Sequence, residues 1–234
     1  VARNFICFGE PDAVVVVCDA TCLERNLNLV LQTTEIFPKV IVCVNLMDEA
    51  ERKRIGLNLE IISERLGVPV IGVVGRKKKS LGKILDTIDD VISGAVVCSP
   101  TKITYSEEIE TAVCALEPIV GNAVKGKLNP RWVSLKLIEQ DETLLNEIYA
   151  YAGKRLTDDL RLQYTLSKEK ARLAQLGIGP EQFKDKIVAS IIFQAEKICG
   201  GAVTYENNEY NSFDRRMDKL LTGKKTGYLI MLLM

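Results

Sequence analysis

The first hundred residues alternate between two hydrophobic periods. Three short runs, at 13–18, 39–44 and 69–74, are continuously apolar and rich in β-branched residues. Such runs are typical of strands that are buried on both faces of a parallel sheet. We therefore expect three parallel strands in this part of the chain.

The segments between these runs repeat their apolar residues at helical spacing. The first segment places Leu23, Leu27 and Val30 on one helical face. Two more segments, 57–67 and 80–94, show the same spacing, and each ends at a glycine, the favoured residue just past a helix. Their expected inward residues are Leu59, Ile62 and Leu66 in the first and Leu81, Ile84, Ile88 and Ile92 in the second. Alternating strands and helices predict a doubly wound α/β unit.

The pattern changes near Pro100, and from there to about residue 200 it predicts helices and no strand. Residues 104–107 fit a capping box, and Pro118 either kinks or ends the helix that follows. Pro130 can open the next helix, whose expected inward residues are Trp132, Leu135 and Ile138. Further helices are expected over three segments: 142–152, 154–176 and 181–199. Together they predict a small helical bundle.

The end of the chain combines a polar stretch, a basic cluster and an apolar run. Residues 201–216 are polar, which predicts a linker. The apolar run GYLIMLLM follows five basic residues: Arg215, Arg216, Lys219, Lys224 and Lys225. A transmembrane helix needs about 20 apolar residues, so the run matches only the start of one, with its basic flank on the cytoplasmic side. An ordinary amphipathic terminal helix is the alternative. The first residue is Val and the last residues are apolar, so we expect both ends to be cut from a longer protein.

The composition argues against several classes of site. Basic and acidic residues are balanced at 31 each, which gives no global charge for nucleic acid, and the 234 residues contain no histidine. The seven cysteines form no CxxC pair, and Cys18 and Cys43 lie in apolar runs, which predicts buried, reduced thiols. A metal role for Cys18 and Cys22 is the less favoured alternative, because these residues straddle a predicted strand end.

The stretch IVCVNLMDEA places Asn45 at the end of the second run and Asp48 three residues later. Ligands of open α/β sheets bind at the carboxyl ends of the strands. A carboxylate there can accept two parallel hydrogen bonds from guanine N1–H and N2–H, a donor pair that adenine lacks. We expect the Asn45 amide to brace the neighbouring loop. The end of the third run, Val74-Gly75-Arg76, is placed to bring a backbone N–H to the purine O6, and Gly75 permits a close approach.

A plainer interpretation makes Asn45 and Asp48 a turn and a helix N-cap before EAERKR. The three basic residues at 77–79 are most simply a solvated loop, with nucleotide or anionic lipid contact as the alternative. The phosphate-binding pattern GxxxxGKS/T occurs nowhere in the 234 residues, nor does DxxG follow a strand near the start. The sequence therefore predicts a base pocket without a phosphate pocket.

Several stretches resemble, in order, the FeoB family of ferrous-iron transporters: VARNFICFGEPDAVVVVCDATCLERNLNLVLQ, VNLMDEA, LGVPVIGVVGRKKKSL, PRWVSLKLIE and DRRMDKLLTGKKTGYLIMLLM. The most specific pieces are DATCLERNLNLVLQ with VNLMDEA, and a pattern formed by Asp214, Asp218, Thr222 and Gly227. In the family, that last pattern leads into the first membrane helix. The family combines a cytosolic G domain, a helical domain and a polytopic membrane domain that moves Fe²⁺ inward.

The resemblance implies an α/β plus α fold, with a partial P-loop-GTPase-like parallel sheet followed by a small helical bundle. It implies three parts: the C-terminal half of a G domain at 1–100, a helical spacer domain at 101–200, and a linker with the start of a transmembrane helix at 201–234. It also implies that nucleotide-binding residues come from two loops: Asn45 and Asp48 in the guanine-specificity motif, and Val74, Gly75 and Arg76 in the last G-protein loop.

The implied function is part of a GTP-dependent Fe²⁺ transporter at the cytoplasmic face of the cell membrane. The implied ligand is GTP or GDP, with Mg²⁺ in the complete protein. The implied partners are the missing N-terminal half of the G domain, the protein's own membrane domain and the transported Fe²⁺, with no nucleic acid. The alternative is a soluble α/β-plus-helical interaction module without nucleotide binding.

Two departures from the G-protein pattern bear on activity. The usual motif has lysine after the asparagine, whereas this chain has Leu46. Because no lysine stem packs over the nucleotide, we expect the nucleotide to be held more weakly and released faster. The phosphate loop and both switch segments would lie upstream of Val1. The parent protein is expected to be a GTPase, and the chain alone is expected to be inactive, since phosphoryl transfer needs that machinery.

Overall fold

The computed structural model describes residues 2–205 and places a parallel sheet at the centre of the first half of the chain. Its strands are, in spatial order, β1 (Val14–Asp19), β2 (Val40–Asn45) and β4 (Val70–Gly72). The first five residues of β2 are all buried, as expected for a central strand of a parallel sheet. All three predicted strands are confirmed, although β4 is shorter than the run that predicted it.

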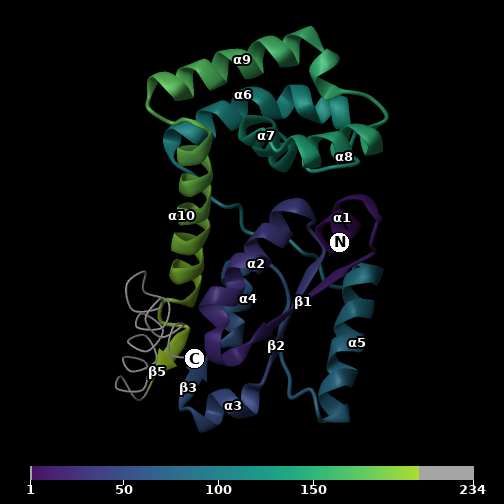
Figure 1. Cartoon of the computed structure of the whole chain (residues 1–234). Coiled ribbons are helices and arrows are strands. Elements are labelled where there is room, and N and C mark those ends of the chain that lie inside the picture. Colours follow the sequence, from purple (N-terminus) through teal and green to yellow (C-terminus); the bar gives the residue numbers. More distant parts are fainter. Residues whose placement is uncertain (1, 206–234) are drawn as a thin grey trace, which may run out of the picture.

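Helices cover both faces of this sheet. Figure 1 shows α2 (Leu23–Ile36) and α4 (Leu59–Leu66) on one side and α5 (Lys78–Ser93) on the other. The predicted inward residues of α2 are confirmed, because Leu23, Leu27 and Val30 are fully buried. Helix α4 ends at Gly67, whose φ of 71° is left-handed and favours glycine.

The predicted inward face of α5 was wrong in part: Ile84 and Ile88 are half-buried, but Leu81 and Ile92 are exposed. Leu81 and Ile92 are each 45% exposed, whereas Val91, which was not predicted to face inward, is 2% exposed. The neighbouring edge strand β1 leaves Val17 61% exposed, on the opposite face from its buried neighbours Val16 and Cys18. The sheet of this chain is therefore too narrow to cover the whole apolar arc of α5.

Hydrophobic periodicity did not predict three short elements: α1 (Ala2–Phe8), β3 (Ile55–Leu57) and β5 (Val203–Tyr205). Strands β3 and β5 pair antiparallel, with Gly56 opposite Thr204. Strand β5 lies inside the segment predicted as a linker, so that prediction was wrong for its first residues. A strand of three residues is too short to show a period, and its partner lies far away in the sequence.

The second half of the chain is helical, as predicted. Its helices are α6 (Glu107–Val124), α7 (Pro130–Glu139), α8 (Glu142–Ala152), α9 (Leu160–Gln175) and α10 (Pro180–Cys199). Helices α6 to α9 form a layer over one end of the sheet region, and α10 runs back beside α2 and α4 (Figure 1). The predicted inward residues of α7, namely Trp132, Leu135 and Ile138, are at most 4% exposed.

The start of α6 differs from the predicted capping box. The N-cap is Ser106, and its hydroxyl makes no capping hydrogen bond. Glu110 instead accepts the backbone N–H of Tyr105 at 2.8 Å and forms an ion pair with Arg131. Pro118 does not end the helix, which continues to Val124. The pairing with Arg131 comes from a distant segment, so local sequence could not reveal it.

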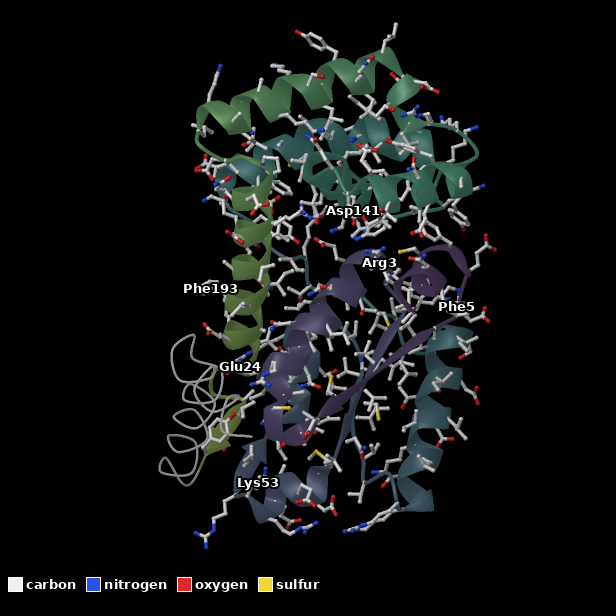
Figure 2. The ribbon with its side chains drawn as sticks, in the orientation of Figure 1. Arg3, Phe5, Glu24, Lys53, Asp141 and Phe193 are labelled. Carbon is white, nitrogen blue, oxygen red and sulfur yellow. The ribbon has the colours of Figure 1, made fainter. Side chains whose placement is uncertain are left out.

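Polar contacts join the helical layer to the sheet region. In Figure 2, Arg3 of α1 lies below Asp141 at the start of α8, with 4.0 Å between Nη1 and Oδ2. Beside them, Asn4 donates to Glu147 at 2.7 Å. The buried apolar residues of both regions form one continuous cluster, so the helical layer and the sheet share a core.

A second joint lies at the far end of α10. Arg65 of α4 donates from Nη1 to the backbone oxygens of Ile198 at 2.7 Å and Gly200 at 2.6 Å. These carbonyls end α10, where a positive charge also complements the helix dipole. We predict that Arg65→Ala lowers the free energy of unfolding by about 1–2 kcal/mol in urea titrations. Arg161→Ala, which removes an exposed arginine of α9, should change it by less than about 0.5 kcal/mol. Equal effects would contradict the capping role.

The other predictions for the end of the chain lie outside the residues that the structure describes. The basic cluster, the apolar run and the pattern that begins at Asp214 all lie beyond residue 205. Within residues 2–205, no helix has both the length and the apolar character needed to cross a bilayer.

Candidate nucleotide-recognition site

The candidate site is built where the parallel strands end. Asn45 is the last residue of β2 and is in register with Asp19, the last residue of β1. The chain leaves β4 at Gly72 and passes Val74 and Gly75 at the same edge of the sheet. This is the edge at which open α/β sheets bind ligands.

The Asn45 side chain joins two loops of this edge. Its Oδ1 accepts the backbone N–H of Gly75 at 3.0 Å, so the β2 loop is tied to the β4 loop. A second tie is made by the backbone, because Met47 N–H donates to Val73 at 3.3 Å. Of the loop Val74-Gly75-Arg76, which was expected to bring a backbone N–H to the purine, the Gly75 N–H is thus already paired with Asn45. A Cβ at Gly75 would lie 3.3 Å from Asn45 Oδ1, so the two residues are in close contact.

Asp48 lies in the first turn of α3 (Met47–Arg52), and its side chain is 19% exposed. The carboxylate forms ion pairs with Arg76 from the β4 loop and with Arg52, whose Nη2 lies 3.5 Å from Oδ2. The N-cap of α3 is Leu46, with no side-chain capping bond. The plainer interpretation of Asp48 as a helix N-cap is therefore wrong.

Leu46 adopts a left-handed backbone conformation, with φ of 61°. Such a conformation is uncommon for a residue with a branched apolar side chain and costs about 1 kcal/mol. The turn nevertheless carries the chain from the end of β2 directly into α3, and this path places Asp48 next to the β4 loop. The Leu46 side chain is 39% exposed at this edge.

The structure places the five predicted residues in two neighbouring loops and pairs Asn45 with Gly75 and Asp48 with Arg76. It also adds one residue that was missed. Arg52 contacts Asp48 from one turn further along α3. Its i,i+4 spacing from Asp48 was the available signal. Asp19 lies at the same edge, but its Oδ1 accepts the Thr21 N–H at 2.7 Å and so caps the short 3₁₀ turn Ala20–Cys22.

The cysteines give no support to the metal alternative. Burial raises the pKa of the Cys18 thiol to about 12, and burial followed by the nearby Asp19 charge raises the pKa of Cys22. A cysteine binds a metal ion as the thiolate, and the surroundings of Cys18 and Cys22 disfavour that form. Across residues 2–205 no cluster of three or more histidine, cysteine, aspartate or glutamate residues could hold a metal ion.

Sheet order, helix placement and the strand-end residues define the class as a P-loop-GTPase-like α/β fold followed by a helical domain. Residues 1–88 match the family model described as Ferrous iron transport protein B. Residues 105–204 match the model of the FeoB cytosolic helical domain. The chain belongs to the FeoB family.

Individual relatives agree with this assignment. The Fe(2+) transporter FeoB of Shigella flexneri is 26% identical over 234 residues, which is 99% of this chain and 28% of the relative. The Fe(2+) transporter FeoB of Escherichia coli (strain K12) is 31% identical over 156 residues, which is 66% of this chain and 19% of the relative. The chain therefore spans less than a third of the length of these curated relatives.

Solved structures show the same fold. The cytosolic domain of T. maritima FeoB in GDP form II superposes with a TM-score of 0.65 at 20% identity, covering 87% of this chain and 72% of that chain. The mGMPPNP-bound NFeoB from S. thermophilus superposes with a TM-score of 0.68 at 21% identity, covering 89% and 74%. At these identities the comparison establishes the fold of this chain.

Proposed function

We propose that this chain supplies the guanine-recognition half of a G domain and the helical regulatory domain of a GTP-dependent Fe²⁺ transporter at the cytoplasmic face of the cell membrane. The observation that carries the proposal is the pair of loops joined by the Asn45–Gly75 hydrogen bond at 3.0 Å, with Asp48 beside them. A carboxylate at that position selects guanine by its paired N–H donors. The GDP and GMPPNP complexes of related FeoB domains support this ligand.

The remaining phosphate and Mg²⁺ chemistry is assigned to a partner, the N-terminal half of the G domain. Support comes from two exposed apolar residues, Val17 on the edge strand β1, which is 61% exposed, and Leu85 on α5, which is 63% exposed. An edge strand with exposed apolar residues is a template for another strand. A strand paired to β1, followed by a helix beside α5, would cover both residues.

The other roles follow the family. We assign residues 101–200 to the helical spacer domain and residues 201–234 to the path toward the protein's own membrane domain, through which Fe²⁺ is moved. The 234 residues alone are expected to hydrolyse no GTP, because the phosphate-binding motif does not occur in them.

Fluorescent GDP and ADP titrations test the proposal. They compare the chain as given with an extended protein, meaning the chain together with the coding sequence immediately upstream of Val1. The extended protein should bind GDP and not ADP, and the shorter chain should bind neither in the same concentration range. A start codon directly before Val1, or equal binding of GDP and ADP by the extended protein, would favour an interaction module without nucleotide binding.

Leu46 offers a prediction about nucleotide release. Leu46→Lys should restore the stem that packs over the nucleotide in the usual motif, and GDP dissociation from the extended protein should slow by about three- to tenfold, from about 1 kcal/mol of added contact. Stopped-flow displacement of fluorescent GDP measures this rate. Leu46→Met, which adds no charge and keeps an apolar chain, is the control. Equal dissociation rates for the two variants would contradict the assignment.

A further inference from the structure

The Asp48 carboxylate already has a charged partner from another loop. Arg76 Nη2 forms an ion pair with Asp48 Oδ2, and this contact links the β4 loop to α3. The Asp48 side chain is 19% exposed, whereas the Arg76 side chain is 70% exposed. The carboxylate is thus held within the site, and the guanidinium approaches it from the solvent side.

The group on Arg76 resembles the edge of guanine that Asp48 is proposed to recognise. A guanidinium is a planar carbon bearing N–H donors in a fork that matches a carboxylate. The N1, C2 and N2 atoms of guanine form the same unit, with N1–H and N2–H as donors. Adenine has no such unit. Arg76 and a guanine base would therefore offer Asp48 the same kind of hydrogen bond, and Arg76 occupies Oδ2, one of the two oxygens that the base requires.

We propose that Arg76 is a built-in competitor of guanine, whose guanidinium occupies the Asp48 carboxylate until the base displaces it. The inference rests on the proposed function and adds regulation to that site. Arg76 then lowers the affinity for guanine instead of contributing to it. It also keeps the two loops together through Asp48, next to the tie between Asn45 and Gly75.

Arg52 does not have the same role. Its Nη2 donates to Glu49 at 2.7 Å and lies 3.5 Å from Asp48 Oδ2, so its closer partner is Glu49. Arg52 can remain in place when a base arrives. Arg76 reaches Asp48 from another loop and is largely exposed, so only its side chain must move and water can solvate it afterwards.

The test uses guanosine, which carries no phosphate, as the competitor against fluorescent GDP on the extended protein. An exposed ion pair contributes modestly, so Arg76→Ala should bind guanosine about two- to fivefold more tightly than wild type. Arg76→Gln, which keeps most of the side-chain length without the charge, should show the same gain. Lys77→Ala removes an equal charge from the next residue and should leave the affinity unchanged.

Salt provides an independent readout. Added NaCl screens the Arg76–Asp48 pair, so guanosine binding to wild type should become tighter with salt, while binding to Arg76→Ala should stay constant. Weaker or equal guanosine binding by both Arg76 variants would overturn the inference while leaving the guanine site intact. If wild type binds guanosine and adenosine equally, the proposed function fails, and the inference fails with it.

Discussion

Replacing Arg131 with methionine is expected to lower the free energy of unfolding by about 3–5 kcal/mol. The Arg131 side chain is 4% exposed and donates to both Glu110 oxygens, at 2.8 and 2.6 Å, and to the Ile103 carbonyl at 2.8 Å. Its guanidinium also lies 5.4 Å from the ring centre of Tyr105. Methionine fills similar volume but leaves the Glu110 carboxylate, which is 27% exposed, without its counter-charge. Equilibrium urea unfolding measures the loss.

A double variant separates charge from packing. Arg131→Met combined with Glu110→Gln removes both members of the pair, so it should be at least about 1 kcal/mol more stable than Arg131→Met alone. If the two losses simply add, packing around Arg131 would account for the effect and the buried ion pair would not.

The loss caused by Arg131→Met should also depend on pH. Burial tends to raise the pKa of Glu110, but hydrogen bonds from Arg131 and the Tyr105 N–H outweigh it and hold that pKa below its ordinary value. A carboxyl with a lowered folded-state pKa stabilises the fold above its unfolded pKa and loses that contribution as pH falls through its folded pKa. The difference between wild type and variant should therefore be larger at about pH 7 than at about pH 3.

Glu35 acts in the same direction. Burial raises the pKa of Glu35. The Tyr105 hydroxyl, which donates to Oε1 at 2.7 Å, and the Arg131 charge lower that pKa but do not outweigh burial. A carboxyl with a raised folded-state pKa loses stabilisation as pH rises through that pKa. Without Arg131 the ionised form of Glu35 is less favourable still, which adds to the loss at neutral pH. A pH-independent difference would contradict the charge network.

Asp48→Ala is expected to remove the preference of the extended protein for GDP over ADP. Two hydrogen bonds to a charged carboxylate correspond to about 2–4 kcal/mol of discrimination, so GDP affinity should fall by about 30- to 700-fold while ADP binding is unchanged. Parallel fluorescent GDP and ADP titrations measure the two affinities.

The neighbouring carboxylate provides the control for that prediction. Glu49 lies next to Asp48 on α3 and pairs with Arg52 at 2.7 Å, so Glu49→Ala removes an equal charge from the same turn. Its effect on GDP affinity should be less than about twofold. An equal fall in GDP and ADP affinity for Asp48→Ala would indicate general damage and would contradict specific recognition.

Strands and helices with a clear hydrophobic pattern could be predicted from the sequence, whereas contacts between distant segments could not. The continuously apolar runs gave three parallel strands, because strands buried on both faces carry no polar face. The inward residues of α2 and α7 followed from helical spacing. The α5 face could not be predicted, because spacing identifies an apolar arc and not which part of that arc the sheet covers. The exposed Leu81 and Ile92 are the result.

The candidate site shows the same division. Asn45 and Asp48 were recognisable because a polar pair interrupts an apolar run at a strand end, the edge where such sheets bind ligands. Their actual partners, Gly75 and Arg76, depend on how the β4 loop returns to α3. The position of Asp48 also depends on the left-handed turn at Leu46 between β2 and α3, which no local propensity would assign to leucine. The ion pair that holds Asp48 was therefore visible only in three dimensions.

The measurement that tests the guanine assignment most directly is an exchange of base specificity. Xanthine carries an oxygen where guanine carries the N2 amine. The protein must therefore offer xanthine a hydrogen-bond donor at the place where it offers guanine an acceptor. Asp48→Asn supplies that donor. Titration of the extended protein and its Asp48→Asn variant with GDP and xanthosine diphosphate should show wild type preferring GDP and the variant preferring xanthosine diphosphate. If the variant loses GDP binding without gaining xanthosine diphosphate, or keeps its preference for GDP, Asp48 does not read the base.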